Sequence, residues 1–295
     1  MTDYAGGQAV IEGVMMRKKD KLATAVRLPN GKIKIKKANL KKRSKFWKLP
    51  FLRGMMALWD MLIIGMRSLL WSADQQLEEH EKITKKEVLF TVIISLTAGI
   101  LLFVVLPYFL TFLLGFKEIE KPIAFNAIDG LIKAAMFIAY IYLISFMKDV
   151  KRLFQYHGAE HKTIYCYEDK KKLIYKNVKP YTTLHPRCGT SFIFLVLTIS
   201  LFVFAVIPSL IIFLWPGLKL LTPLAQRGVL LPVRLLFMPI IAGIGFEVLK
   251  LSAKFQDKAI FQPIIKPGLW LQKITTKEPD KKQIEVAIAA LHAVK

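Results

Sequence analysis

Four long and nearly uninterrupted apolar segments dominate the chain from residue 88 onward. Crossing the roughly 30 Å hydrocarbon layer of a bilayer takes about 20 helical residues, and each segment is long enough. The four segments are Val88–Phe116, Ala127–Met147, Ser191–Trp215 and Val229–Leu251. This pattern predicts an α-helical polytopic membrane protein with four transmembrane helices, two within residues 88–147 and two within 191–251.

A fifth apolar segment, Leu49–Trp71, has a different pattern. Arg53, Asp60 and Arg67 recur every seven residues, which places them on one stripe of a helix. We therefore predict one interfacial amphipathic helix, with a charged lead-in to the first span, over residues 49–87. A re-entrant or a fully spanning helix remains the alternative.

The two ends of the chain show short periodicities. Residues 1–48 alternate in the manner of strands, and Asn30-Gly31 supplies a hairpin turn, so we predict a small, basic β-hairpin segment there. The tail, residues 252–295, begins with the turn-rich segment 262–280. It then places Ile284, Ile288 and Leu291 on one face of a short amphipathic helix.

Charge orients these elements. The formal net charge is +23, and residues 1–87 hold 19 Lys/Arg, Lys148–Arg187 ten and Lys250–Lys295 nine. The two other loops hold only four, namely Lys117, Lys121, Lys219 and Arg227. Because positive residues stay on the cytoplasmic side, we expect a multi-pass protein of the cell membrane with both termini and the loop 148–190 in the cytoplasm. The same rule disfavours a full span at 49–71.

The basic N-terminal segment bears on the binding partners of the protein. Arg17–Lys48 contains 14 Lys/Arg and one Asp. Membrane lipids explain such a segment better than a nucleic acid does, and a protein partner or a homo-oligomer stays open.

The two cysteines, Cys166 and Cys188, both fall on the expected cytoplasmic side, where a structural disulfide is disfavoured. Cys166 we interpret as an inert residue, whereas Cys188 is a candidate metal ligand.

The strongest chemical signal is "YHGAEHKTIYCYE", residues 156–168. His157 and His161 share one face if the helix of the second span continues past Met147, with Glu160 beside them. Imidazoles at i and i+4 are a common pair of metal ligands, and a neighbouring glutamate can serve as general base. The string is also the H-x-x-E-H motif of the inverted zinc proteases, although alone it is short enough to arise by chance.

The expected topology brings further ligands to the same membrane surface. His185 and Cys188 directly precede the third span, and Glu247 lies near the inner end of the fourth. An ionisable residue within a span usually has a function or a partner. We therefore predict a metal site of His157, His161, His185, Cys188 and Glu247, with Glu160 as the catalytic residue.

Simpler interpretations of these residues stay open. Glu160 could pair with Lys162 or Arg187, and Glu247 with Lys250. Glu12, in "IEGVMMR", either pairs with Arg17 or reaches the site.

Taken together, these motifs resemble the YqhQ-like family of prokaryotic membrane proteins. The resemblance rests on "GGQAVIEGVMMR" at 6–17, "YHGAEHKTIYCYE" at 156–168, "HPRCGTSF" at 185–192, "GIGFEVLKL" at 243–251 and the tail at 267–291. That family is a domain of unknown function whose members are sometimes described as metal-dependent enzymes. The resemblance implies no substrate.

Two hypotheses follow. The first is a metal-dependent membrane enzyme, with zinc or another divalent transition metal at the cytoplasmic face, that hydrolyses a peptide or a lipid-linked substrate. The alternative is a non-enzymatic membrane scaffold or assembly factor that binds lipid or a protein partner through its basic cytoplasmic regions. A transporter is weaker, because Lys133, Arg234 and Glu247 do not form an obvious path.

Overall fold

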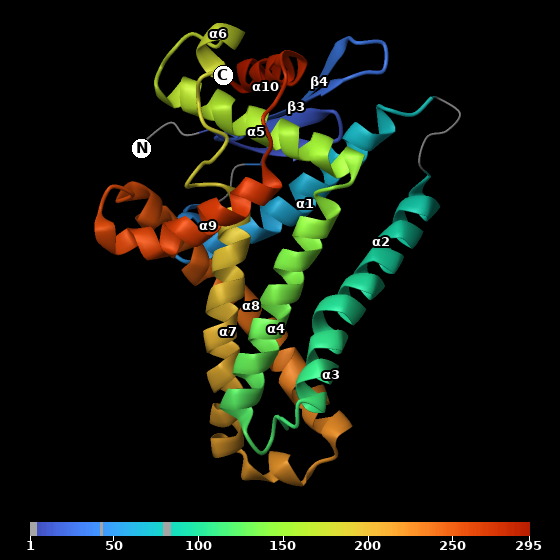
Figure 1. Ribbon diagram of the computed structural model, residues 1–295, viewed down its shortest axis with the longest axis vertical. Helices are drawn as coiled ribbons and strands as arrows, with labels where there is room; N and C mark the ends of the chain where they lie inside the picture. Colours follow the sequence, from blue (N-terminus) through green and yellow to red (C-terminus); the bar gives the residue numbers. More distant parts are fainter. Residues whose placement is uncertain (1–4, 42–43, 79–83) are drawn as a thin grey trace.

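The computed structural model describes residues 5–41, 44–78 and 84–295 of the chain; parts of the predicted N-terminal segment and of the charged lead-in fall outside these ranges. Figure 1 shows a bundle of long helices at one end and a cap at the other, where a small sheet and shorter helices gather. The chain is mostly helical, with one N-terminal antiparallel sheet.

The bundle contains α2 (Lys85–Ile100), η3 (Leu101–Val105), α3 (Leu106–Leu113), α4 (Pro122–Ile144), α7 (Gly189–Leu214), η4 (Pro216–Leu220) and α8 (Pro223–Lys254). The cap contains β1 (Ala5–Val10), β2 (Gly13–Lys18), β3 (Lys21–Arg27), β4 (Ile33–Asn39), α5 (Lys148–Glu168), α6 (Tyr175–Val178) and α10 (Lys281–Val294). Between them lie η1 (Lys45–Lys48), α1 (Leu52–Asp74), η5 (Ala259–Phe261) and α9 (Gln262–Thr275).

The sheet is a simple antiparallel meander in the order β1-β2-β3-β4. The predicted hairpin turn is confirmed, since Gly31 has φ +83° between β3 and β4. Side chains alternate across a sheet, so Val14 and Met16 pack with α5 and α10 while Met15 faces α1. The central strands β2 and β3 are therefore buried on both faces, which explains the consecutive apolar residues of β2, whereas β4 is mostly exposed.

The tail is more helical than the sequence indicated. The segment 262–280, which we expected to be turn-rich, forms α9 up to Thr275. Pro263 lies in the first turn, where the missing N–H has no helical partner to lose. The final amphipathic helix is confirmed as α10, whose Ile284 and Leu291 are completely buried against the sheet.

In the described part of the chain, five helices, rather than the four expected, are long and apolar enough to cross a membrane. They include the four predicted spans, whose surfaces expose large apolar side chains such as Phe90 and Leu236. Such surfaces are typical of helices that face lipid, and on this ground we treat the chain as a multi-pass membrane protein.

The fifth candidate is α1, which has the lowest hydropathy of the five. Figure 1 shows α1 crossing the end of the bundle beneath the sheet, not running alongside α4 and α7. Its buried Ser68 and Ser72 bond to Thr24 and to the N–H of Ile11 in the sheet. The charged stripe is engaged as well, because Asp60 pairs with Arg17 and Arg53 with Glu247.

Two details modify the predicted spans. The first span is one continuous helix, Lys86–Leu113, with a π-helical turn at Leu101–Val105 before Pro107. Proline cannot donate to the preceding turn, and a π turn is one way of accommodating that loss. The second span ends at Ile144 and does not continue past Met147, so the two histidines lie on the separate helix α5.

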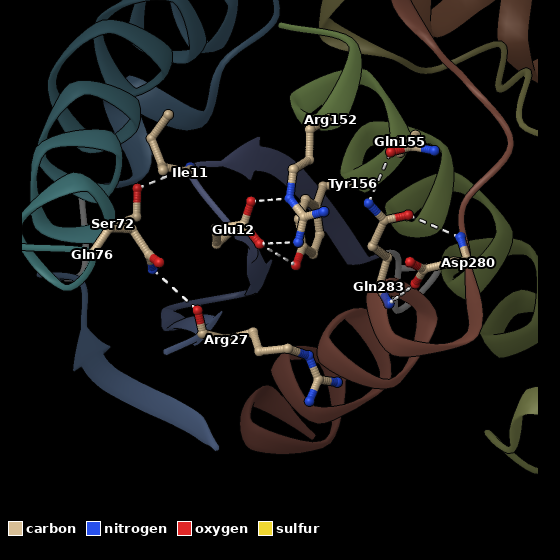
Figure 2. A network of polar contacts seen from close by, with 10 residues as sticks. All are labelled: Ile11, Glu12, Arg27, Ser72, Gln76, Arg152, Gln155, Tyr156, Asp280 and Gln283. Carbon is tan, nitrogen blue, oxygen red and sulfur yellow. Dashed lines mark hydrogen bonds and ion pairs between the residues drawn. The ribbon is translucent and has the colours of Figure 1, made fainter. Parts of the chain in front are cut away.

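Glu12 holds the sheet to α5. It occupies the turn between β1 and β2 at φ 51°, a conformation that non-glycine residues rarely adopt. Figure 2 shows its carboxylate accepting from the Arg152 guanidinium and from the Tyr156 hydroxyl. Glu12 thus pairs with Arg152, not with Arg17. Nearby contacts in the same view join Ser72 and Gln76 of the α1 end to the sheet.

We expect Glu12→Gln to lower the free energy of unfolding of the cap by about 1–3 kcal/mol, because Arg152 loses its carboxylate and the strained turn loses its anchor. Urea titration of the detergent-purified protein measures this change. The matched control is Glu285→Gln, which removes a similarly exposed pair with Arg27 but no anchor of a strained turn, and it should change stability by less than about 1 kcal/mol. Equal effects of the two substitutions would contradict this role for Glu12.

Candidate metal centre

Helix α5 presents His157, Glu160 and His161 on one face, one turn apart. Their helix packs between the sheet and the end of α9, which buries Glu160 and His161. The two imidazole rings are in edge contact, with their centroids 4.4 Å apart. The i, i+4 spacing therefore brings both histidines together as the sequence predicted.

Backbone carbonyls fix the orientation of both imidazoles. His157 Nδ1 donates to the carbonyl of Thr275 at 2.8 Å, and His161 Nδ1 donates to the carbonyl of Thr183. A carbonyl oxygen can only accept, so each Nδ1 carries a hydrogen. In the neutral imidazole this leaves Nε2 with a free lone pair, the arrangement that metal-binding histidines commonly show.

Cys188 reaches the histidines from a tight turn. It is the N-cap of α7, and its sulfur accepts from the N–H of Thr190 at 3.3 Å. The turn is held by Gln272 of α9, whose amide group accepts from the N–H of His185 and donates to its carbonyl at 2.7 and 2.9 Å. The packing of α9 thus determines where the Cys188 sulfur lies.

His157, His161 and Cys188 form one compact group. Their ligand atoms all lie within 4.8 Å of one another, and His157 Nε2 is 3.2 Å from the Cys188 sulfur. The members come from α5 and from the turn before α7, about 30 residues apart in the sequence. This group is the part of the predicted ligand set that the structure brings together.

The group is electrostatically coupled. Burial favours the neutral thiol of Cys188, but the neighbouring His157 and His161 outweigh it and hold the pKa of the thiol well below its usual range. Burial likewise opposes charge on His157, yet its attraction to and hydrogen bond with Cys188 raise the pKa of His157 to about 9. Both shifts act in the same sense and favour a Cys188 thiolate next to a His157 imidazolium.

Glu160 lies beside this pair and is only 5% exposed. Burial raises the pKa of its carboxyl group, against the opposing effect of the two histidines. The N–H of Gly7 donates to the carboxylate, and a Cβ at Gly7 would lie 2.9 Å from Glu160 Oε1. Glu160 pairs with neither Lys162 nor Arg187, which contact Glu278 and Glu168 instead.

His185 adjoins the group without belonging to it. Its ring centroid lies 5.6 Å from that of His161, and its buried Nε2 makes no hydrogen bond to the described residues. The nearest carboxylate oxygen, on Glu168, is 3.7 Å away. Burial lowers the pKa of His185, so it is neutral near pH 7. Its Nδ1 accepts from the N–H of Arg187 at 3.2 Å, so the hydrogen of the neutral ring lies on Nε2 and that atom has no lone pair for a metal.

Glu247 is directed to a different contact. Its carboxylate forms an ion pair with Arg53 of α1 and accepts from the N–H of Phe51 at 3.0 Å. The structure therefore does not bring Glu247 into the compact group, and its partner is Arg53, not Lys250.

Cys166 is buried in the cap core, apart from the compact group of His157, His161 and Cys188.

Three residues that position the site, Gln272, Thr275 and Thr183, were not predicted from the sequence. Gln272 lies in the tail, where an isolated amide carries no pattern, and the carbonyls of Thr275 and Thr183 belong to the backbone. One signal was present, namely Gly158 within "HGAEH", because a Cβ there would lie 2.2 Å from the Lys277 carbonyl. That glycine indicates a backbone segment pressed against α5.

The fold and this group define a class of protein, a multi-pass membrane protein with a buried His/His/Cys cluster at one end of its helix bundle. Residues 49–295 match the model of a family described as "Protein of unknown function (DUF1385)", and the chain belongs to that family. It is 36% identical over 305 residues to the "Uncharacterized protein YqhQ" of Bacillus subtilis (strain 168), covering 97% of this chain and 91% of that protein. This agrees with the family resemblance of the motifs. No solved structure matches the chain.

We expect the alkylation rate of Cys188 by iodoacetamide, in protein treated with a chelator, to rise less steeply between pH 6 and pH 8 than that of Cys166. The neighbouring histidines lower the pKa of the Cys188 thiol, whereas burial raises the pKa of Cys166, whose rate should rise about tenfold per pH unit. Mass spectrometry of the two cysteine peptides measures both rates. In His157→Gln the Cys188 rate should rise more steeply with pH; a Cys188 rate that rises as steeply as that of Cys166 in the unsubstituted protein would contradict the ion pair.

Proposed function

We propose that this protein is a metal-dependent membrane enzyme, a hydrolase, in which His157, His161 and Cys188 hold a zinc ion. The observation that carries the proposal is the convergence of three ligand atoms within 4.8 Å, with both histidines oriented by backbone carbonyls. Histidines and cysteines that meet by chance would not have their ring orientations fixed by hydrogen bonds to backbone carbonyls.

The donor set fits the metal. Two imidazoles and a thiolate suit zinc or another divalent transition metal, and three protein ligands leave a fourth position open. Ligands at about 2.0–2.3 Å from a tetrahedral centre lie about 3.3–3.8 Å apart. The His157–Cys188 distance of 3.2 Å is close to this spacing, and the remaining separations, at most 4.8 Å, require a contraction of about 1.5 Å or less.

Each residue of the site would have a separate role in hydrolysis. Bound zinc supplies Lewis acidity, which polarises a substrate oxygen and makes water more acidic. Glu160, next to both histidines and with a raised pKa, accepts and returns the proton as general base and acid. The thiolate of Cys188 balances the charge of the ion, and Gln272 keeps the sulfur in place.

The location of the site also belongs to the proposal. We place the cap in the cytoplasm, because most of the positive charge lies there or in loops next to it. The face of α1 opposite the sheet exposes Trp59, Leu62 and Met66, so α1 lies in the membrane interface with lipid against that face. A site at this boundary suits a peptide or a lipid-linked substrate presented at the membrane surface.

Metal analysis of the detergent-purified protein tests the ligands. We expect about one zinc per chain in the unsubstituted protein and in Glu160→Gln, and loss of the metal in Cys188→Ser and in the double variant His157→Ala, His161→Ala. The controls are Cys166→Ala and His292→Ala, which change a buried thiol and an exposed imidazole outside the group. Stoichiometric metal that survives the double substitution would falsify the ligand assignment.

A second candidate is a structural metal site in a membrane scaffold. The observation that favours it is the enclosure of the group, since His161 and Cys188 are only 2% and 7% exposed. Cobalt substitution separates the two candidates. An open position predicts that azide alters the visible absorption spectrum of the cobalt protein, whereas a closed four-ligand site predicts no change.

A further inference from the structure

A second polar cluster lies at the opposite end of the bundle, away from the cap. There α3, α4 and α8 surround a cavity of about 410 Å³. Its wall is mostly apolar and aromatic, with three cations and one carboxylate among the lining residues. The charged members are Lys133, Arg227, Arg234 and Glu118.

Helical spacing builds the two long walls. Arg227, Leu230, Leu231 and Arg234 recur at i, i+3, i+4 and i+7, so they occupy one face of α8. Tyr108, Phe109 and Phe112 form the facing wall on α3. Figure 1 shows α3 standing beside α4 and α8 at the end of the bundle remote from the sheet.

The charges of this cavity are only partly compensated. Arg234 donates to Glu118 and Asn126, and Lys133 pairs with Asp129, so two of the cations have carboxylate partners. Among the described residues, the buried Nε of Arg234 and Oδ1 of Asp129 make no hydrogen bond. Arg227 has an aromatic neighbour instead, its guanidinium lying 3.7 Å from the centroid of the Tyr108 ring.

We propose that this cavity binds the headgroup and the upper acyl chain of one anionic phospholipid. Arg227 and the free edge of Arg234 contact the phosphate, and Val105, Phe109 and Phe112 line the path of the acyl chain. This inference is independent of the metal site, because none of its residues takes part in that group.

Charge and position favour this occupant. The wall carries an excess of positive charge even when the pair Lys133–Asp129 is counted as neutral. Cations are otherwise sparse at this end, where the two loops add only Lys117, Lys121 and Lys219. Charged groups within a span are costly and usually mark a ligand or a partner. An apolar wall next to these cations matches an amphiphile better than a free anion.

The test measures lipid retention. The full-length protein is reconstituted with equal amounts of dioleoylphosphatidylglycerol and dioleoylphosphatidylcholine, extracted with mild detergent, and examined by native mass spectrometry. We expect preferential retention of the anionic lipid. Arg227→Gln, which leaves no carboxylate unpaired, and Val105→Trp, which fills the cavity without changing charge, should each reduce retention about fivefold or more.

Matched controls separate a built site from a charged surface. Lys219→Gln removes an exposed cation at the same end of the bundle, and Val206→Trp adds a tryptophan to the exposed surface of α7; neither residue lines the cavity. Both controls should retain the lipid as the unsubstituted protein does. Equal retention of the two lipids, an equal loss in Lys219→Gln, or full retention in Val105→Trp overturns the proposal.

Discussion

The site depends on one short stretch of backbone, residues 272–277 at the end of α9. Its Gln272 clamps the turn that carries Cys188, and its Thr275 carbonyl orients His157. The following segment closes against α5, because the N–H of Lys277 donates to the carbonyl of Phe154 at 2.9 Å. His157 and Cys188, which are far apart in the sequence, are therefore positioned by a third segment that contributes no side chain to the group. A group held in this way is preorganised, since hydrogen bonds from the chain itself set its geometry.

The bundle obeys a different constraint, the cost of charge in hydrocarbon. Arg53 pairs with Glu247, Lys133 with Asp129 and Arg234 with Glu118. Such pairs add little stability compared with apolar packing, but removing one partner leaves a costly buried charge. They consequently restrict which helices can meet. The pair of Arg53 with Glu247 ties α1 to the end of α8, and the pair of Arg234 with Glu118 ties the other end of α8 to the loop before α4.

Much of the fold and part of the site could be predicted from the sequence, for physical reasons. Continuous apolar segments, the turn at Asn30-Gly31 and the periodicity of Ile284 and Leu291 are local signals, and local structure follows them. The pairing of His157 with His161 is equally local. The contact of Cys188 with His157 followed from topology, because one membrane surface collects the segments that return to it. The partner of Glu247 did not follow, since Arg53 belongs to a helix whose path depends on its docking beneath the sheet.

The helix α9 shows where such interpretation fails. Proline and glycine in "QPIIKPGLWLQK" indicate turns when the segment is considered alone. Yet Pro263 lies in the first helical turn, and a Cβ at Gly268 would lie 2.6 Å from Ser191 Oγ, so this glycine permits close packing against α7. Tertiary contact therefore overrides local preference here. The same holds at Gly54, whose Cβ would lie 2.6 Å from Phe246 Cβ of α8, and at Gly158 on α5. At Gly54, Gly158 and Gly268 the missing side chain therefore permits a close approach between segments, and the approaches at Gly158 and Gly268 help to position His157 and Cys188.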